Sequence, residues 1–286
     1  MRSPFFLLFL VVVLASCSDY QKVMKSTKVE EKFAFADSLF RVADAGNQTG
    51  ASRKQRRRAE GACTKAIPML EELVQLTRGS TLSERVYYEH AKCQFFTKDY
   101  IMASYYLSNF TRTFPASAMA EECSFLAAYC YYRNSPNYEL DQSDTKAAIE
   151  DMQLFLVAYP DSPLKDSANA LVRTMRGKLE VKDLNNSRQY YRLRNYQGTI
   201  TAFSAFVRAW PNSEFREEAL FTLLQASAML ARNSVEYRKK QRVAEAIQAY
   251  HNFADAFPES PDKREASRLL EELNAYQAQN ETSLKP

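Results

Sequence analysis

The sequence predicts an all-α protein built as an array of about five helix pairs, with one further helix that caps the C-terminal end. Two observations lead to this fold class. The 286 residues include only six glycines and ten prolines, which favours long helices and few tight turns. A junction of four residues also recurs four times, and each copy consists of an aromatic residue, a proline, one variable residue and a serine. Repetition of this kind is the signature of a repeat array.

The chain begins with an apolar run, Phe5–Leu14, that follows Arg2 and leads through Ala-Ser to Cys17. The run is too short to cross a bilayer, which takes about 20 apolar residues, and it has the parts of a secretory leader. Small residues directly before a cysteine match the lipobox of bacterial lipoproteins, in which the cysteine is acylated and the leader is removed. We therefore expect a lipoprotein signal peptide over residues 1–16, lipidation of Cys17 and a tether over residues 17–29. The alternative is an ordinary signal peptide with an incidental cysteine.

The net charge of the chain favours no particular partner. Without Arg2 the 38 lysines and arginines become 37, against 34 aspartates and glutamates. Four further cysteines, Cys63, Cys93, Cys123 and Cys130, match no zinc-binding spacing. The periplasm permits disulfides, but cysteines on helix faces usually pack as small hydrophobic residues. We interpret these four in that way, while their pairing stays open.

The four junctions explain how one helix ends and the next begins. A proline cannot continue the hydrogen-bond ladder of a helix, and a serine two residues later can cap the following helix. A small residue eight positions after each proline would let two helices approach closely. The aromatic residue is expected to pack between layers of helices, although a functional indole is the alternative for Trp210, the only tryptophan. The junctions are Phe114-Pro115-Ala116-Ser117, Tyr159-Pro160-Asp161-Ser162, Trp210-Pro211-Asn212-Ser213 and Phe257-Pro258-Glu259-Ser260.

An amphipathic helix precedes each junction, because apolar residues recur at steps of three or four and so share one face. These faces run over Tyr100–Phe114, Thr145–Tyr159, Tyr196–Trp210, Val243–Phe257 and, more weakly, Cys63–Thr77. Partner helices are expected over Leu82–Phe96, Ala118–Arg133 and Phe215–Arg232, one long helix over Leu164–Arg194, and the end cap over Asp262–Gln279. The array would thus occupy residues 30–279, followed by a disordered tail over residues 280–286.

Repeated helix pairs with an alanine, an aromatic residue and a terminal proline resemble the tetratricopeptide repeat family. The resemblance implies a right-handed superhelix. Successive junction prolines lie 45, 51 and 47 residues apart, compared with about 34 in that family. Insertions account for the excess: one is Asn134–Asp144, and another lengthens the first repeat through residues 45–58.

The sequence offers little that suggests an enzyme. Its two histidines, His90 and His251, fall inside predicted repeat helices, and no catalytic or nucleotide-binding motif occurs. The carboxylates sit on helix faces that we expect to be solvated. We therefore expect no catalytic residue, no cofactor and no metal site.

The sharpest charge feature is a basic run, which consists of Arg53, Lys54, Arg56, Arg57 and Arg58. Such a run would suggest nucleic acid inside a cell, but behind a lipobox nucleic acid is not an expected partner. Contact with anionic lipid headgroups is the functional interpretation. A solvated loop that leads into a helix is the alternative.

Two other surfaces are predicted to bind protein partners. Aromatic residues crowd the second and third repeats, and two or three of them would line a concave groove suited to a peptide. Alignment of the repeats sets Lys92 against Tyr129 and Gln225, at a position that would face this groove. In the C-terminal pair, a connector between the two helices would meet acidic side chains of a partner, unless it is a solvated loop. Its basic residues are Arg238, Lys239, Lys240 and Arg242.

A lipobox followed by such repeats resembles the lipoproteins of the outer-membrane β-barrel assembly machinery. The resemblance runs from Cys17 to about Ala278 and includes "CSDYQKVMKS", "SPNYELDQSDT" and the junctions, whereas the basic insertion departs from the family. It implies a lipid-anchored scaffold on the periplasmic side of the outer membrane. The C-terminal repeats would bind the periplasmic domains of the barrel insertase, and the N-terminal repeats would bind the C-terminal signal of unfolded outer-membrane proteins. The alternative is another helical-repeat envelope lipoprotein, either a division or peptidoglycan scaffold or a glycan-binding protein.

Overall fold

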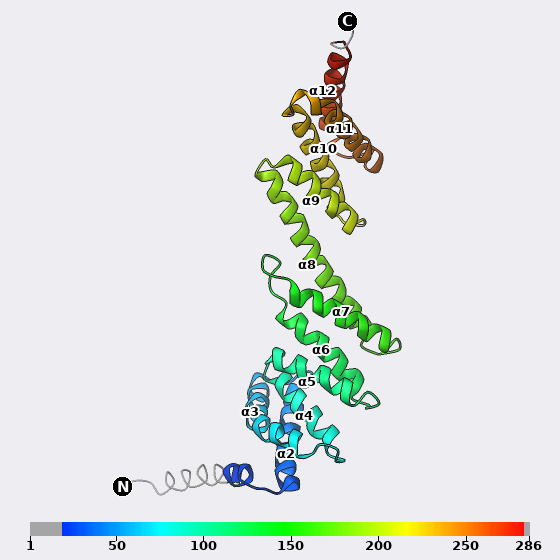
Figure 1. The fold of residues 1–286 in the computed structure, drawn as a ribbon. Helices are drawn as coiled ribbons and strands as arrows, with labels where there is room; N and C mark the ends of the chain where they lie inside the picture. The colour runs from blue at the N-terminus through cyan, green and yellow to red at the C-terminus, as the bar shows by residue number, and fades with distance from the viewer. Residues whose placement is uncertain (1–18, 283–286) are drawn as a thin grey trace, which may run out of the picture. The chain divides into compact units, whose positions relative to one another are not determined.

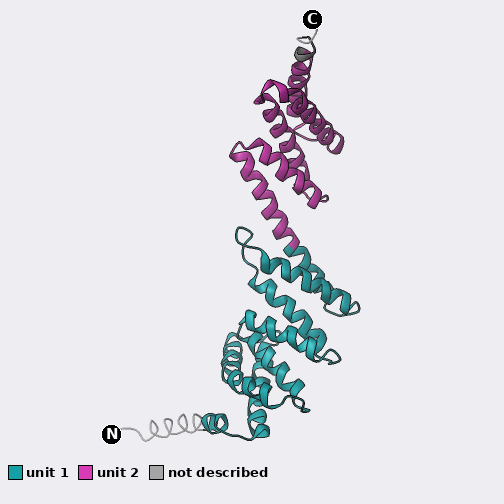
Figure 2. Cartoon of the chain, in the orientation of Figure 1, with its two compact units in different colours: residues 1–175 teal, residues 176–286 magenta. Residues whose placement is uncertain are grey.

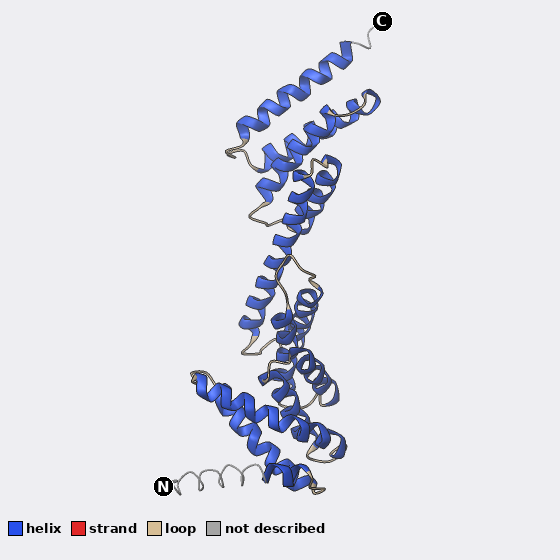
Figure 3. Ribbon diagram, turned by 90° about the vertical axis from the view of Figure 1, so that its left-hand side faces the viewer, coloured by secondary structure: helices blue, strands red, loops and turns tan. Residues whose placement is uncertain are grey.

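The computed structural model describes residues 19–282, and within this range every regular element is a helix (Figure 1). Figure 3 shows helices joined by short loops, with no strand in the described part of the chain. The predicted all-α repeat fold is confirmed, and its right-handed course stays a prediction. The predicted signal peptide and Cys17 lie outside the described residues.

The expected partner helices, the long helix and the end cap begin and end within three residues of the observed bounds, whereas α3 (Arg53–Leu76) and α11 (Glu236–Ala256) begin ten and seven residues before the amphipathic segments predicted for them. The long helix expected over 164–194 is the single helix α8. The described helices are α2 (Val29–Asn47), α3 (Arg53–Leu76), α4 (Ser83–Phe96), α5 (Tyr100–Thr113), α6 (Ala120–Asn134), α7 (Ser143–Ala158), α8 (Lys165–Arg192), α9 (Tyr196–Ala209), α10 (Arg216–Arg232), α11 (Glu236–Ala256) and α12 (Lys263–Thr282).

The chain forms two compact units, residues 1–175 and 176–286, and the division falls inside α8 (Figure 2). In the described part of the first unit, each helix from α2 to α7 packs against the next one in the chain, and α2 also contacts α4. In the second unit the same order holds from α9 to α12, and α10 also contacts α12. Each unit therefore consists of helix hairpins stacked in sequence order, as expected for a repeat protein.

All four junctions adopt one backbone geometry. The aromatic residue ends the preceding helix with φ between −125° and −135° and ψ between 61° and 68°. The serine N–H donates to the carbonyl oxygen of the aromatic residue at 3.1–3.2 Å. The serine Oγ then accepts the N–H of the residue two positions later at 3.0–3.1 Å. The expected capping serine therefore stands before the N-cap, which is Met119 in α6 and Phe215 in α10, and it closes the turn that leads into the helix.

A fifth junction of the same kind lacks the proline, and the sequence pattern did not identify it. Ser80 N–H donates to the Thr77 carbonyl at 2.9 Å, and Ser80 Oγ accepts the Leu82 N–H at 3.3 Å. Gly79 supplies the positive φ of 74° that this turn requires. Among the described junctions, proline is thus one of two ways in which the second helix of a pair ends.

The small residues expected at close helix contacts are buried. Cys123, Ala168 and Ala219 are fully inaccessible, and Ala266 is 1% exposed. Trp210 lies only partly buried beside the cluster of Leu184, Phe203 and Phe206. Its indole N–H donates to Asp183 Oδ2 at 3.0 Å. The other junction aromatics, Phe114, Tyr159 and Phe257, are also partly buried and pack against core clusters.

The structure resolves the pairing of the four cysteines, which the sequence left open, and shows that two of them are not simply small hydrophobic residues. Cys63 of α3 and Cys93 of α4 form a disulfide with a Cα–Cα distance of 5.0 Å, and both are inaccessible to solvent. Cys123 and Cys130 are free and buried, and burial raises the pKa of both thiols to about 12. These two therefore pack as neutral hydrophobic residues, as predicted.

Candidate partner-binding surfaces

Lys92 was expected to face a groove, but the structure buries it between α4 and α6. The residue is 6% exposed, and its ammonium forms an ion pair with Glu122 of α6. The same ammonium lies 5.1 Å from the ring centre of Phe96 and 5.7 Å from that of Tyr88, whose hydroxyl donates to Glu122 at 2.8 Å. Lys92 therefore joins two layers of the array and is not available to a partner.

The equivalent residues in later repeats also make contacts between layers. Tyr129 of α6 lies partly buried, with its ring centre 6.1 Å from that of Phe95 in α4. Gln225 of α10 donates to Glu265 of α12 at 3.1 Å. This position of the repeat thus belongs to the packing between layers.

A glutamate seven residues after the junction proline receives these contacts. Lys92 reaches Glu122, Arg188 reaches Glu218 at 2.6 Å, and Gln225 reaches Glu265. The spacing was present in the sequence at three of the four junctions, with Ser167 in the remaining one. A comparison of glutamates across the repeats would have identified it before the structure.

The groove lies two positions farther along the same helices. A cleft of about 700 Å³ opens between α5, α6 and the start of α7. Tyr131 of α6 lines it, and residues 129 and 131 point about 200° apart around a helix. Tyr129 therefore faces a neighbouring layer, where it meets Phe95, while Tyr131 faces the cleft. Phe125 on the side of Tyr129 likewise meets Phe155 of α7. The full lining is Ile101, Ser104, Tyr105, Ser108, Arg112, Tyr131, Asn134 and Asp144.

The cleft exposes apolar side chains on a helix that is otherwise well packed. The buried face of α5 carries Ala103, Leu107 and Phe110, all inaccessible. The opposite face carries Ile101, which is 72% exposed, and Tyr105, which is 58% exposed. Asp99 caps this helix by accepting the Met102 N–H at 3.1 Å, which fixes the turn that bears Ile101. An exposed isoleucine and tyrosine that line a concave surface are typical of a protein-binding site.

The second unit has a cleft at the same place in its repeat. It lies between α9, α10 and α11 and has a volume of about 230 Å³. Five of its lining positions fall 96 residues after positions of the first cleft, which is the distance from Pro115 to Pro211: Gln197, Ile200, Ser204, Ser227 and Leu230. The repeat thus presents one groove position in both units, with an aromatic lining in the first and a mixed lining in the second.

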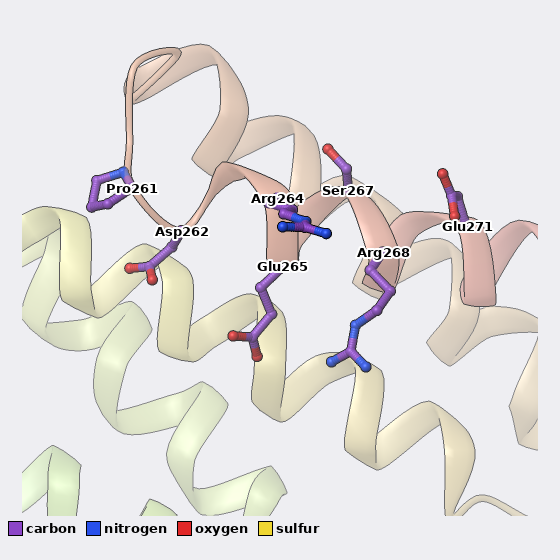
Figure 4. A pocket seen from close by; sticks show the side chains of 7 residues that line it. All are labelled: Pro261, Asp262, Arg264, Glu265, Ser267, Arg268 and Glu271. Carbon is purple, nitrogen blue, oxygen red and sulfur yellow. The ribbon is translucent and has the colours of Figure 1, made fainter.

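A charged surface surrounds the start of the last helix. Figure 4 shows Glu265 and Arg268 on one side of α12, with Ser267 and Glu271 on the opposite side. Charges of both signs alternate here along a single helix, so the surface suits a charged partner rather than an apolar ligand. The lining residues are Pro261, Asp262, Arg264, Glu265, Ser267, Arg268 and Glu271.

The basic connector of the C-terminal pair is helical, because α11 already begins at Glu236. Arg242 donates to Ser234 Oγ at 2.7 Å, and the Lys239 ammonium lies 4.8 Å from the ring centre of Tyr276 in α12. These two side chains support the fold. Arg238 and Lys240 are exposed, and within residues 19–282 neither forms an ion pair. They are the two that remain open to a partner.

Buried charged groups in the first unit hold helices together. Arg85 of α4 bonds Glu89 at 2.5 Å and lies 3.4 Å from Asp37 of α2. Burial raises the pKa of Glu89 to about 8 despite the neighbouring Arg85, and burial lowers the pKa of His90 to about 4. Both groups are inaccessible, so they serve packing rather than surface chemistry.

Among residues 19–282 no group of three or more His, Cys, Asp or Glu could hold a metal ion. No helix in the same range is long and apolar enough to cross a membrane.

Comparison with known proteins identifies the family. The profile of the family YfiO, described as outer membrane lipoprotein, matches residues 51–241, which is more than half of the chain. The "Outer membrane protein assembly factor BamD" of Caulobacter vibrioides is 22% identical over 185 residues, covering 65% of this chain and 59% of that protein. A solved chain from "Computational Design of Self-Assembling Cyclic Protein Homooligomers" aligns at 13% identity over 94% of this chain and 92% of its own, with a TM-score of 0.21, which is too low to indicate a shared fold. On the family match, this chain belongs to the YfiO family of outer membrane lipoproteins.

Proposed function

We propose that this protein is a lipid-anchored periplasmic scaffold of the outer-membrane β-barrel assembly machinery. Family membership supports an outer membrane lipoprotein, and similarity to a BamD supports a part in assembly. In this proposal the acyl chains on Cys17 hold the protein at the membrane, and the two units bind different partners.

The first cleft is the proposed site for unfolded outer-membrane proteins, and its exposed apolar lining is the observation that carries this assignment. Ile101 and Tyr105 project from α5, and Tyr131 faces them from α6. An extended chain segment can place alternate apolar side chains against such a surface while its backbone bonds to polar groups at the rim. Ser108 and Asn134 supply those polar groups.

Binding of a labelled peptide tests this assignment. The peptide would carry the C-terminal residues of a barrel protein from the same organism, and its affinity would be measured by fluorescence anisotropy. Replacing Ile101 and Tyr105 by alanine should weaken binding by about tenfold or more, since an aromatic contact residue commonly contributes 1–2 kcal/mol or more. Leu154→Ala with Val157→Ala is the matched control, because these residues of α7 are 61% and 80% exposed and lie outside the cleft lining. Equal loss in both double variants would refute the cleft as the site.

The C-terminal pair is the proposed contact for the periplasmic domains of the insertase. Arg238 and Lys240 present two positive charges that the fold does not use, and such charges speed association with an acidic surface. Replacing both by glutamate should weaken binding to the purified domains, with a strong salt dependence in the wild type. Arg173→Glu with Arg176→Glu on the exposed side of α8 is the control. Unchanged affinity at low salt would place the interface elsewhere.

Purification from detergent-solubilised membranes separates this function from the alternatives. The barrel insertase should co-purify with the tagged protein if it belongs to the assembly machinery. Recovery of division proteins or peptidoglycan-binding proteins without the insertase would favour the other envelope scaffold. Recovery of glycan alone would favour a glycan-binding lipoprotein.

A further inference from the structure

The first unit carries a strongly basic surface that the proposed function does not use. Arg53, Lys54, Arg56, Arg57 and Arg58 form the start of α3, and all five are exposed. We call these five residues the α3 basic end. Ser52 and Gln55 form a capping box, with bonds of 3.3 Å from Gln55 N–H to Ser52 Oγ and 2.8 Å from Ser52 N–H to Gln55 Oε1. The surface is therefore part of a well-formed helix and not the loop considered from the sequence.

These charges do not stabilise the helix that bears them. The N-terminus of a helix has a positive dipole end, so cations there are unfavourable. Arg53 and Arg57, like Lys54 and Arg58, are also spaced at i and i+4, where like charges repel. Within residues 19–282 no ion pair compensates any of the five. An external anionic partner would relieve both costs.

The structure holds this surface near the predicted lipid attachment site. Tyr20 OH donates to the Lys65 carbonyl oxygen of α3 at 3.3 Å, and its ring centre lies 6.4 Å from that of Phe35 in α2. Three peptide steps separate Tyr20 from Cys17, which allows at most about 10 Å. Lys65 is seven to twelve residues beyond the α3 basic end, or about 10–18 Å along the helix axis. With the Tyr20 side chain and its hydrogen bond included, the chain allows at most about 40 Å between the predicted attachment site and the far end of the basic surface.

The segment between the anchor and α2 adds to the positive charge. Lys22, Lys25 and Lys28 are exposed, and only Lys22 has an ion-pair partner among the described residues, Asp19 at 4.0 Å. A lipidated chain with basic residues close to the membrane has the two signals that stable surface attachment requires. Residues 19–28 and the α3 basic end together carry eight basic residues and one acidic residue, Asp19, and this excess of positive charge suits an anionic surface on the side of the anchor.

We propose that the α3 basic end binds the anionic phospholipid headgroups of the leaflet in which the acyl chains of Cys17 are embedded. Arginine suits this role, because its planar guanidinium forms paired hydrogen bonds with phosphate oxygens. Together with the acyl anchor, this contact orients the first helix pair against the membrane instead of leaving the unit free on its tether. The proposal rests on the lipid anchor of the proposed function, and its test separates the two.

The first experiment uses the complete lipidated chain in vesicles. Vesicles of phosphatidylcholine alone would be compared with vesicles in which a quarter of the lipid is phosphatidylglycerol, and limited trypsin digestion would be followed at two places. Cleavage after Arg53–Arg58 should slow roughly tenfold on the anionic vesicles and recover at high salt, as surface attraction is screened. Cleavage after Arg238 and Lys240 in the same chain is the internal reference and should not change. Equal rates on both vesicles would overturn the proposal.

The second experiment does not depend on lipidation. The mature chain with Cys17→Ser would be sedimented with the same vesicles, and the anionic vesicles should retain it. Replacing the five basic residues by glutamine should abolish retention, whereas glutamine at Arg173, Arg176, Arg192, Arg238 and Lys240 should preserve it. Equal retention of both variants, or full displacement of the wild type by inorganic phosphate at the concentration of lipid phosphate, would refute a membrane surface as the partner. If mass spectrometry instead shows Cys17 without acyl chains, the anchor fails while this second experiment still decides the headgroup contact.

Discussion

Trp210 allows the energetics of a junction to be separated into packing and hydrogen bonding. Replacing a fully buried aromatic residue by alanine lowers the free energy of unfolding by about 3–5 kcal/mol. Phe203 of the same cluster is inaccessible, so Phe203→Ala should show a loss of that size. Trp210 is only partly buried, so Trp210→Ala should cost about 2–3 kcal/mol. Trp210→Phe keeps a ring in a slot that holds Phe114 and Phe257 elsewhere. It loses the bond to Asp183 and should cost about 1 kcal/mol, since that bond is solvent-exposed.

The measurement is urea unfolding followed by far-ultraviolet circular dichroism, because Trp210 is the only tryptophan and its removal eliminates the tryptophan fluorescence signal. Hydrogen exchange on α9 and α10 would assign the loss to this junction. Asp183→Ala should cost as much as Trp210→Phe, and the double variant should cost less than their sum, because both remove one bond. If Trp210→Ala leaves the free energy of unfolding nearly unchanged, the packing role is refuted and Trp210 becomes a candidate binding residue.

Three further outcomes are expected. Cys17→Ser should give a folded protein that a high-salt wash releases from the membrane fraction, because salt screens the remaining contact with anionic headgroups while an acyl anchor would withstand it. Mass spectrometry of the wild type should show an acylated Cys17; an unmodified N-terminus at another residue would contradict this. Replacing Cys63 and Cys93 by alanine should lower the unfolding free energy by about 3–4 kcal/mol, from a loop with a sequence separation of 30, and a reductant should shift the melting of the wild type alone. The pKa of Glu89 rises from 4.5 to about 8 on folding, so its stabilisation is complete below pH 4.5 and is lost as the pH rises through 8. Below pH 6.5 the buried His90 gives the opposite slope, because its pKa falls from 6.5 to about 4 on folding. The fall in stability due to Glu89 is therefore measured between about pH 6.5 and 8. Glu89→Gln should flatten that fall, and an unchanged slope would show that Glu89 titrates normally.

The contrast between Lys92 and Tyr131 shows where sequence reasoning reached its limit. Alignment of the repeats correctly recognised that Lys92, Tyr129 and Gln225 are equivalent. It did not decide which face of the helix is exposed, because polar residues occur on more than one face. A lysine can be buried when its ammonium meets a carboxylate from the next layer, and Glu122 lies 30 residues away in the chain. The choice between the face of Tyr129 and that of Tyr131 depends on which neighbouring helix covers which side.

The sequence by itself determined the helices, their order and the junctions, because these depend on local chemistry. At the four junctions the proline ends a helix and the serine closes the next turn, although Pro68 lies inside α3, and the apolar spacing indicates the face that packs against the core. The Cys63–Cys93 bond, the ion pairs between layers and the position of the clefts depended on the tertiary structure. Each of these needs two segments brought together from far apart in the chain, and their separation and facing are set by how the helices stack.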